Sequence, residues 1–173
     1  MTDPDDLCPK LVDYPGLSID RAQSPSPELN RFLYTAVGGD WHWVDRLTWT
    51  YQQWQEWVRR PELDTWVAFI SGAPAGYFEL ESQASSNVEI VSFGLLPPFI
   101  GQGLGGHLLT VAVGEAWRMA AKRVWLHTCT LDHPGALSNY QARGFRVFQK
   151  STVSQEVLEH SPGPCPGADG VVS

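Results

Sequence analysis

The sequence is short of positive charge and contains no long apolar run. Its 12 lysines and arginines are outnumbered by 19 acidic residues, which gives a net charge of -7. This balance argues against a nucleic-acid partner, because phosphate backbones are bound through clustered basic side chains. No apolar stretch reaches the roughly 18 residues that a membrane-spanning helix needs, so we expect no membrane partner either.

Cysteine is also scarce. Cys8, Cys129 and Cys165 are far apart and form no CxxC pair, so we expect neither a disulfide framework nor a zinc site. The five histidines show no metal-ligand spacing, and we predict no metal site. The N-terminal sequence "MTDPDDLCPK" is acidic where a signal peptide would be basic and then apolar. These features together predict a cytoplasmic protein.

What is present is a pattern of helices and strands typical of one mixed α/β domain over residues 1–160. Residues 161–173 are rich in proline and glycine and are predicted to be disordered. In the first part of the chain we expect frayed residues at 1–9, a first strand at 10–14 or 17–20, a helix capped by Ser26 and ending at 38–39, and a helix from Thr50 to about 60. In the middle we expect a hairpin at 65–82, a strand at 87–96 and a helix at 103–121. In the last part we expect a strand at 123–131, a helix capped by Asp132 and ending near 143, and a last strand at 145–154.

Residues 95–109, "LLPPFIGQGLGGHLL", form a glycine-rich segment without a lysine or an arginine. Gly101, Gly103 and Gly106 satisfy G-x-G-x-x-G, but in a dinucleotide-binding fold the strand runs directly into the first glycine. Here Pro97-Pro98 intervene, and the expected acidic residue after the next strand is missing. A Walker loop is excluded because no G-K-[ST] is present. A glycine-rich turn without a ligand remains an alternative.

A strand, a proline-containing turn and x-G-x-G-x-G at the start of a long helix resemble the acyl-CoA-binding motif of GCN5-related N-acetyltransferases. The family pattern Arg/Gln-x-x-Gly-x-Gly/Ala falls on residues 100–105. A second family motif, A-x-x-x-Y-x-x-x-G-F, is similar to "ALSNYQARGF" at residues 136–145. The resemblance covers about residues 64–154. It implies a central, mostly antiparallel sheet with a splayed strand pair, flanked by helices.

The resemblance implies that a thioester donor, acetyl-CoA, binds at the glycine-rich segment. Glycine frees the backbone to turn its N–H groups inward at the positive end of a helix, so an anion is held without a side-chain cation. The cofactor-binding residues carried over are Leu95, Leu96, Ile100, Gly101, Gln102, Gly103, Leu104, Gly105, Gly106 and Asn139.

Ile100 departs from the family pattern, which has Arg or Gln at that position. This leaves two donors open: acetyl-CoA with Gln102 hydrogen-bonding in place of charge, or an acyl-phosphopantetheine arm on an acyl carrier protein. The function implied is transfer of an acetyl or other acyl group to the amine of a small-molecule acceptor by direct attack. A non-catalytic acyl-CoA-binding module is the alternative from another class.

For the chemistry, the resemblance implies Tyr140 as the acid that protonates the leaving sulfur, because a phenol is protonated at neutral pH. Glu89 is the predicted base, since family members that acetylate histones have a glutamate at the same distance from the loop. Strand alternation predicts that Glu89 shares one face with Val91, Phe93 and Leu95. Glu79 and Glu81 are the alternative bases. The resemblance also implies a backbone N–H near Leu95 for the oxyanion.

An acceptor site is predicted in the tryptophan-rich stretch at residues 38–49, because aromatic faces favour ammonium groups. Filling of the core by these tryptophans is the alternative. The resemblance leaves a homodimer open. The predicted substrate-binding residues are Trp41, Trp43, Asp45, Arg46, Glu79 and His127.

Overall fold

The structure, a computed structural model, describes residues 1–152, and its centre is a five-stranded sheet in the order β1-β2-β3-β4-β5. The first four strands are antiparallel to their neighbours, whereas β5 runs parallel to β4. The mixed α/β fold is therefore confirmed. The strands are β1 (Leu17–Arg21), β2 (Leu63–Ile70), β3 (Ala73–Gln83), β4 (Asn87–Leu95) and β5 (Arg123–Leu126).

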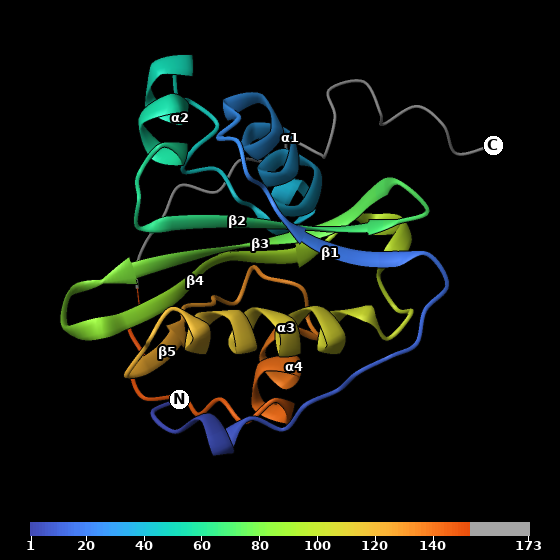
Figure 1. Ribbon diagram of the computed structural model, residues 1–173, viewed down its shortest axis with the longest axis vertical. Helices are drawn as coiled ribbons and strands as arrows, with labels where there is room; N and C mark the ends of the chain where they lie inside the picture. Colours follow the sequence, from blue (N-terminus) through green and yellow to red (C-terminus); the bar gives the residue numbers. More distant parts are fainter. Residues whose placement is uncertain (153–173) are drawn as a thin grey trace.

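Helices cover both faces of this sheet (Figure 1). On one face lie α1 (Pro27–Gly38) and α2 (Tyr51–Val58), and on the other lie α3 (Leu104–Arg118) and α4 (Ala136–Ala142). Among the helices of residues 1–152, none combines the length and apolarity needed to cross a bilayer. The predicted tail at 161–173 lies outside the described residues. Short 3-10 turns occur at Pro4–Asp6, Gly39–Trp41, Ala84–Ser86 and Pro97–Phe99.

Local signals explain the two helices of the first face. Ser26 caps α1, its Oγ accepting a hydrogen bond from the N–H of Leu29 at 3.2 Å. Thr50 and Gln53 form a reciprocal capping box at the start of α2. These bonds satisfy N–H groups that have no acceptor within the helix, so both predicted helix starts are confirmed.

The other face of the sheet carries the larger apolar core. Phe78 and Leu80 of β3 pack there against Leu109 and Val113 of α3, and all four are fully buried. Burial of a side chain of this size contributes about 1.5–3 kcal/mol, so this layer supplies most of the hydrophobic stabilisation.

A bulge in β4 changes which residues share a face. Leu80 of β3 pairs with Ile90, whereas the preceding residue, Glu79, pairs with Ser92, so Val91 is an extra residue. Because one extra residue reverses the alternation, Ile90 and Phe93 both face α3 and Glu89 faces the α1/α2 side. The prediction that Glu89 shares a face with Phe93 and Leu95 is therefore wrong.

The first fourteen residues pack along the α3/α4 side instead of fraying (Figure 1). Met1 and Val124 of β5 exchange two backbone hydrogen bonds of 2.9 Å. Further along, the N–H of Cys8 donates to the carbonyl of Arg143, and the N–H of Lys10 donates to Thr110 Oγ1. The prediction of a frayed N-terminus is wrong, and the second alternative for the first strand is the observed one.

Three predictions at the C-terminal side are corrected. The strand predicted at 123–131 ends at Leu126, and α4 begins at Ala136 without a side-chain cap. Asp132 instead accepts hydrogen bonds from the Thr128 hydroxyl and the Cys129 N–H, which organise the loop before α4. Residues 145–152 form no strand, because Met1 takes the outer edge of β5 at Val124. Residues 153–154 of that prediction lie outside the described residues.

Candidate active site

The parallel pair β4 and β5 separates part of the way along β4, and we call this place the fork. Their pairing ends at Ile90 and Leu126, whereas β4 continues to Leu95. The N–H of Leu96 donates to Ala75 on the β3 side at 2.9 Å. Because successive N–H groups of a strand point in opposite directions, the N–H of Leu95 is directed into the fork. This is the direction that an oxyanion or amide ligand between the strands requires.

The glycine loop follows the fork and leads into α3. Gly101 and Gly103 have φ of 84° and 80°, a backbone conformation that side chains disfavour, and Gly103 is the N-cap of α3. Within residues 1–152, the N–H groups of residues 101–105 donate no hydrogen bond to a turn, a loop or a side chain, and the first helical N–H groups have no acceptor in α3 itself. The loop thus presents several donors at the positive end of a helix of 15 residues.

Gln102 is not available to replace the missing cation. Its Nε2 donates to the carbonyl of Pro98 at 2.7 Å, and its Oε1 accepts from the Tyr14 hydroxyl at 2.8 Å. These two bonds hold the loop in shape. The expectation that Gln102 hydrogen-bonds the donor in place of charge therefore does not fit the structure.

Two cations reach the loop from distant parts of the chain. A Cβ placed on Gly106 would lie 2.5 Å from Arg143 Nη1 and 2.7 Å from Lys10 Cδ, and one on Gly103 would lie 3.8 Å from Lys10 Nζ. Within the described part of the chain, neither cation forms an ion pair with a carboxylate. The fold therefore supplies the positive charge that the local sequence lacks.

Tyr140 and Asn139 of α4 lie beside the same region. The Tyr140 ring is buried and packs edge-on against Phe93 of β4, with ring centroids 6.0 Å apart. Burial, aided by the charge of Asp132, raises the pKa of the Tyr140 phenol above its ordinary value of 10, so the hydroxyl keeps its proton at neutral pH. Asn139 Nδ2 donates to the carbonyl of Gly105 at 3.2 Å, which ties α4 to the loop.

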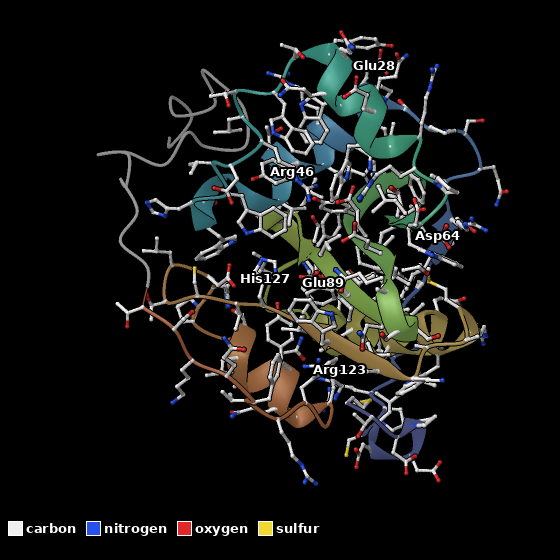
Figure 2. The ribbon with its side chains drawn as sticks, turned by 90° about the vertical axis from the view of Figure 1, so that its left-hand side faces the viewer. Glu28, Arg46, Asp64, Glu89, Arg123 and His127 are labelled. Carbon is white, nitrogen blue, oxygen red and sulfur yellow. The ribbon has the colours of Figure 1, made fainter. Side chains whose placement is uncertain are left out.

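Glu89 and His127 meet at the base of the fork, on the side that faces α1 and α2 (Figure 2). Glu89 Oε1 lies 2.7 Å from His127 Nδ1, and Glu89 Oε2 accepts from Gln83 Nε2 at 2.7 Å. The His127 side chain is 71% exposed, whereas that of Glu89 is only 9% exposed. A buried carboxylate thus holds an imidazole that faces outward.

Glu79 is the centre of a second polar cluster and is 1% exposed. Its carboxylate accepts hydrogen bonds from Asn30, Arg46, Trp57 and Ser92 at 2.7–3.3 Å. All its oxygens are therefore engaged by groups of the α1/α2 layer and β4. The predicted role of Glu79 in binding an acceptor, or as an alternative base, does not fit this burial.

Arg46 is enclosed by aromatic rings as well as by Glu79. Its guanidinium carbon lies 3.9 Å from the ring centroid of Trp57, 5.2 Å from that of Trp49 and 5.5 Å from that of Tyr34. A cation over an aromatic face is stabilised by the ring quadrupole. The chain itself thus fills this aromatic cage, and Arg46 is part of the packing instead of the surface of a pocket.

The remaining acceptor candidates are divided between core and surface. Trp43 packs on Tyr34 and Tyr77 in the smaller core, as the alternative of core filling predicted. Asp45 is exposed. The ring centroids of Trp41 and His133 lie 4.8 Å apart. This contact joins the loop after α1 to the loop after β5 across the fork.

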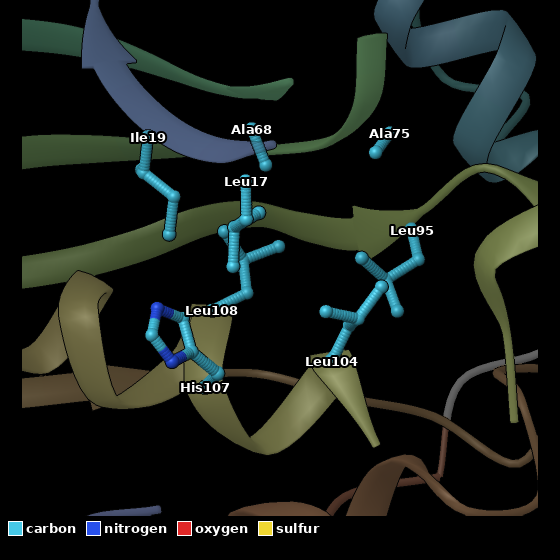
Figure 3. A pocket seen from close by; sticks show the side chains of 8 residues that line it. All are labelled: Leu17, Ile19, Ala68, Ala75, Leu95, Leu104, His107 and Leu108. Atoms are coloured by element: carbon cyan, nitrogen blue, oxygen red, sulfur yellow. The ribbon is translucent and has the colours of Figure 1, made fainter. Parts of the chain in front are cut away.

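Figure 3 shows a small apolar cavity of about 10 Å³ between β1 and α3, lined by Leu17, Leu104 and His107 among others. A shallower hollow of about 270 Å³ adjoins it between Val12 and Val111. The first cavity extends under the sheet from β1 to Leu95 of β4 and to Leu104 at the start of α3, whereas the second lies at the β1 edge. Neither is lined by Glu89 or His127.

Sequence reasoning missed Lys10, Arg143 and Gln83 as contributors to this region. Lys10 lies 93 residues before Gly103, as the difference of their numbers gives, and no local pattern connects them. Arg143 stands inside the second motif, next to Gly144, so its position offered a signal that was not used. Gln83 could have been found from the hairpin register, which brings the end of β3 next to the start of β4.

Comparison with known proteins gives a consistent picture. The model of the acetyltransferase (GNAT) family matches residues 28–145. No curated protein matches the chain significantly.

Solved structures with the same fold are numerous. An aminoglycoside acetyltransferase from an uncultured soil metagenomic sample, in complex with trehalose, has a TM-score of 0.66 and 15% identity, covering 83% of this chain and 97% of that chain. A GNAT family acetyltransferase from Streptococcus pneumoniae TIGR4 has a TM-score of 0.59 and 20% identity, covering 81% and 98%. AAC(6')-Iy, in complex with the bisubstrate analogue CoA-S-monomethyl-acetylneamine, has a TM-score of 0.62 and 16% identity, covering 82% and 99%. At these identities the likeness shows the fold.

Proposed function

Because this chain belongs to the GNAT acetyltransferase family, we propose that it transfers an acetyl group from acetyl-CoA to the amine of a small-molecule acceptor. The observation that carries this proposal is the fork with the glycine loop at its end. Three features follow one another along the opening between β4 and β5: the free N–H groups of the glycine loop, the phenol of Tyr140 and the Glu89–His127 pair. This is the order in which a donor's phosphates, thioester and attacking amine would lie.

The cations beside the loop favour acetyl-CoA over an acyl carrier protein as the donor. Lys10 and Arg143 supply charge that suits a pyrophosphate and a further phosphate, whereas a carrier-protein arm has a single phosphodiester. A carrier protein must also dock its own surface on the enzyme. With a net charge of -7, this chain has little positive charge with which to attract such a surface. Ile100 is thus compensated by charges from elsewhere in the fold.

In the reaction, the acceptor nitrogen bonds to the thioester carbon, and the carbonyl electrons move to the oxygen. In this proposal the N–H of Leu95, which is directed into the fork, stabilises that oxyanion. When the C–S bond breaks, the phenol of Tyr140 gives its proton to the departing sulfur, since its raised pKa keeps that proton in place beforehand. The amine's own proton leaves towards the Glu89–His127 pair.

For the acceptor we propose a small cationic amine. Trp41, His133 and the exposed imidazole of His127 border the α1/α2 side of the fork, and the net negative charge favours the approach of a cation. One protein with the same fold is described as an aminoglycoside acetyltransferase, in complex with trehalose in one structure and with sisomicin in another, and aminoglycosides are polyamines of this class. Sisomicin and spermidine are therefore suitable first acceptors.

The test is a screen of acetyl-CoA with sisomicin, spermidine, tyramine and glycine, following thiol release and the mass of the products. We expect an acetylated amine for at least one cationic acceptor and none for glycine. Calorimetry with acetyl-CoA alone tests the donor separately. Binding without transfer to any amine would favour the non-catalytic module, and no binding would remove the proposal.

A Tyr140→Phe variant tests the acid. It lowers kcat about 100-fold or more, because a positioned general acid contributes 10²–10⁴-fold, and leaves the acetyl-CoA Kd unchanged. The neighbouring Gln141→Ala variant, an exposed residue of the same helix, is the matched control and retains wild-type kcat. Equal activity of the phenylalanine and wild-type proteins would contradict the role given to Tyr140.

A further inference from the structure

The contact between His127 and Glu89 indicates that two residues act together as the base, one accepting the proton and one holding that proton acceptor in position. We propose that His127 Nε2 receives the proton of the attacking amine and that Glu89 is a positioning residue, holding His127 through Nδ1. This inference rests on the proposed function. It differs from the expectation drawn from the sequence, in which Glu89 itself takes the proton.

Exposure separates the two side chains. Glu89 is only 9% exposed, and both of its oxygens are already engaged, one by His127 Nδ1 and one by Gln83 Nε2. Gln83 is in turn fixed by Trp125, whose Nε1 donates to Gln83 Oε1 at 3.1 Å. Direct contact of an acceptor amine with the carboxylate would need space beside these two bonds, at a side chain that is almost fully buried. His127 is 71% exposed and needs no such rearrangement.

The carboxylate also determines which nitrogen of the imidazole is free. An ionised carboxylate only accepts hydrogen bonds, so His127 Nδ1 carries the proton and donates it to Glu89 Oε1. In the neutral ring, Nε2 is then an unprotonated acceptor. Within the described residues, no hydrogen bond to His127 Nε2 occurs, so this nitrogen is available to an incoming amine.

The position of His127 at the end of β5 brings its Nε2 atom to the reaction site. His127 directly follows Leu126, whose pairing with Ile90 is the last contact between β4 and β5. By strand alternation, His127 and Trp125 point to the α1/α2 face, and their rings are neighbours with centroids 6.5 Å apart. Figure 2 shows Glu89 and His127 side by side between Arg46 and Arg123. The imidazole thus stands where an acceptor would enter the fork.

The surrounding charges tune this imidazole. The hydrogen bond to Glu89 raises the pKa of His127 above its ordinary value of 6.5, burial opposes this, and the charges of Glu89 and Asp132 add to the increase while that of Arg46 lowers it. The guanidinium carbon of Arg123 lies over the Trp125 ring, 5.8 Å from its centroid. Because the neutral ring is the active form, kcat/KM rises with pH through this increased pKa and falls below it.

Protons and electrons balance in the proposed step. The attacking nitrogen first loses its ammonium proton to solvent. As a neutral amine it forms the new C–N bond and gives a second proton to His127 Nε2, which becomes a doubly protonated imidazolium next to the Glu89 carboxylate. The C–S bond breaks, and the sulfur receives the proton of Tyr140. Solvent then removes the proton from His127 and returns one to Tyr140, so both residues are restored and the products are an amide and a free thiol.

The experiment compares His127→Asn and Glu89→Gln with wild type, using acetyl-CoA and the best amine of the screen. Asparagine retains an N–H for Glu89 but has no basic nitrogen. We expect His127→Asn to lower kcat about 100-fold, with acetyl-CoA affinity unchanged and the acidic limb of the pH profile lost. Glu89→Gln retains the imidazole, so we expect about a tenfold decrease and an acidic limb moved to lower pH. Glu62→Gln, on an exposed glutamate just before β2, is the matched control and changes kcat less than threefold.

A measurement without an acceptor separates this inference from the proposed function. The His127 Cε1–H resonance, assigned by its absence in His127→Asn, gives the pKa directly by NMR titration. We expect the pKa above 6.5 in wild type and a lower pKa in Glu89→Gln. An unchanged pKa in that variant, or wild-type activity and acidic limb in His127→Asn, overturns the inference even if acetyl transfer is found. Loss of activity in Glu89→Gln alone assigns the proton to Glu89 and also overturns it. No transfer in wild type, with the titration as expected, overturns the proposed function and leaves the pair intact.

Discussion

The two faces of the sheet are built in different ways. The face towards α3 and α4 is a continuous apolar core in which side chains of β3, β4 and α3 interlock. The face towards α1 and α2 contains buried polar side chains joined by hydrogen bonds. These are Asn30, Thr65, Glu79, Glu89 and Ser92.

The difference shows which face fixes the positions of side chains and which face contributes most to the free energy of unfolding. Apolar contacts are non-directional, so the α3/α4 face tolerates small repacking at modest cost. Buried charges require their partners in specific positions, since an unpartnered polar group costs about 1–3 kcal/mol or more. The polar face therefore fixes the loop after α1 and the Glu89–His127 pair in place, while the apolar face supplies the driving force for folding.

The largest effect is expected from Glu79→Ala, which attacks the polar face. Removal of the carboxylate leaves the guanidinium of Arg46 buried without a counter-charge, at a cost of about 3–5 kcal/mol in the free energy of unfolding. Urea unfolding measures this change. A Glu79→Leu/Arg46→Met double variant recovers at least half of the loss, because it removes both charges. If the single variant is as stable as wild type, the cluster has no structural role.

Leu109→Ala attacks the apolar face and should cost about 3 kcal/mol, because it leaves a cavity in a fully buried site. Leu109→Met keeps the volume and is expected to cost less than about 1.5 kcal/mol. Activity per folded molecule should remain at the wild-type level in both, which separates this face from the reaction. A specific loss of kcat in Leu109→Ala, measured well below the unfolding midpoint, would erase the distinction between the faces.

Gly144→Ala tests the N-terminal segment that covers the α3/α4 side. Gly144 has a φ of 99°, and an added Cβ would lie 2.0 Å from the carbonyl oxygen of Asp6. Backbone strain alone costs about 1–2 kcal/mol, and the contact with Asp6 must open as well. Hydrogen exchange at the Val124 amide, which is bonded to Met1, should become faster in the variant. Unchanged exchange would show that the segment docks independently of Gly144.

The smallest effect on stability is expected from Lys10→Met and Arg143→Met, which alter only the charge beside the loop. Each should weaken acetyl-CoA binding about tenfold, with a decreased dependence on salt, and leave the unfolding free energy within about 0.5 kcal/mol. Acetyl-pantetheine, which has no phosphate, is the matched donor and should bind all proteins equally. Equal loss for both donors would show that these residues act on the fold instead of the phosphates.

Local elements of the fold were predictable from the sequence because their causes are local. Ser26 and Thr50 cap the helices they precede, and a turn at residues 71–72, within the predicted 71–74, joins the two strands of the hairpin. The glycines before α3 were sufficient to predict a helix start with free N–H groups.

The candidate site was less predictable because it depends on register and on distant contacts. A single bulge at Val91 reverses the face of Glu89, and nothing in "VEIVSFGLL" marks the extra residue. Lys10 reaches the loop only because Met1 pairs with Val124 and Lys10 with Thr110. Arg46 was expected to line a pocket because tryptophans surround it in the sequence. In the structure the rings of Trp49 and Trp57 enclose its guanidinium in the interior.

The N-terminal segment has a consequence for the order in which the protein folds. Met1 bonds to a residue 123 positions later, and Lys10 bonds to one 100 positions later. During synthesis this segment must therefore wait for most of the domain before its partners have been made. Such sequence-distant pairings slow folding, so we expect the docking of this strand-like arm to be the last and slowest event in the maturation of the chain.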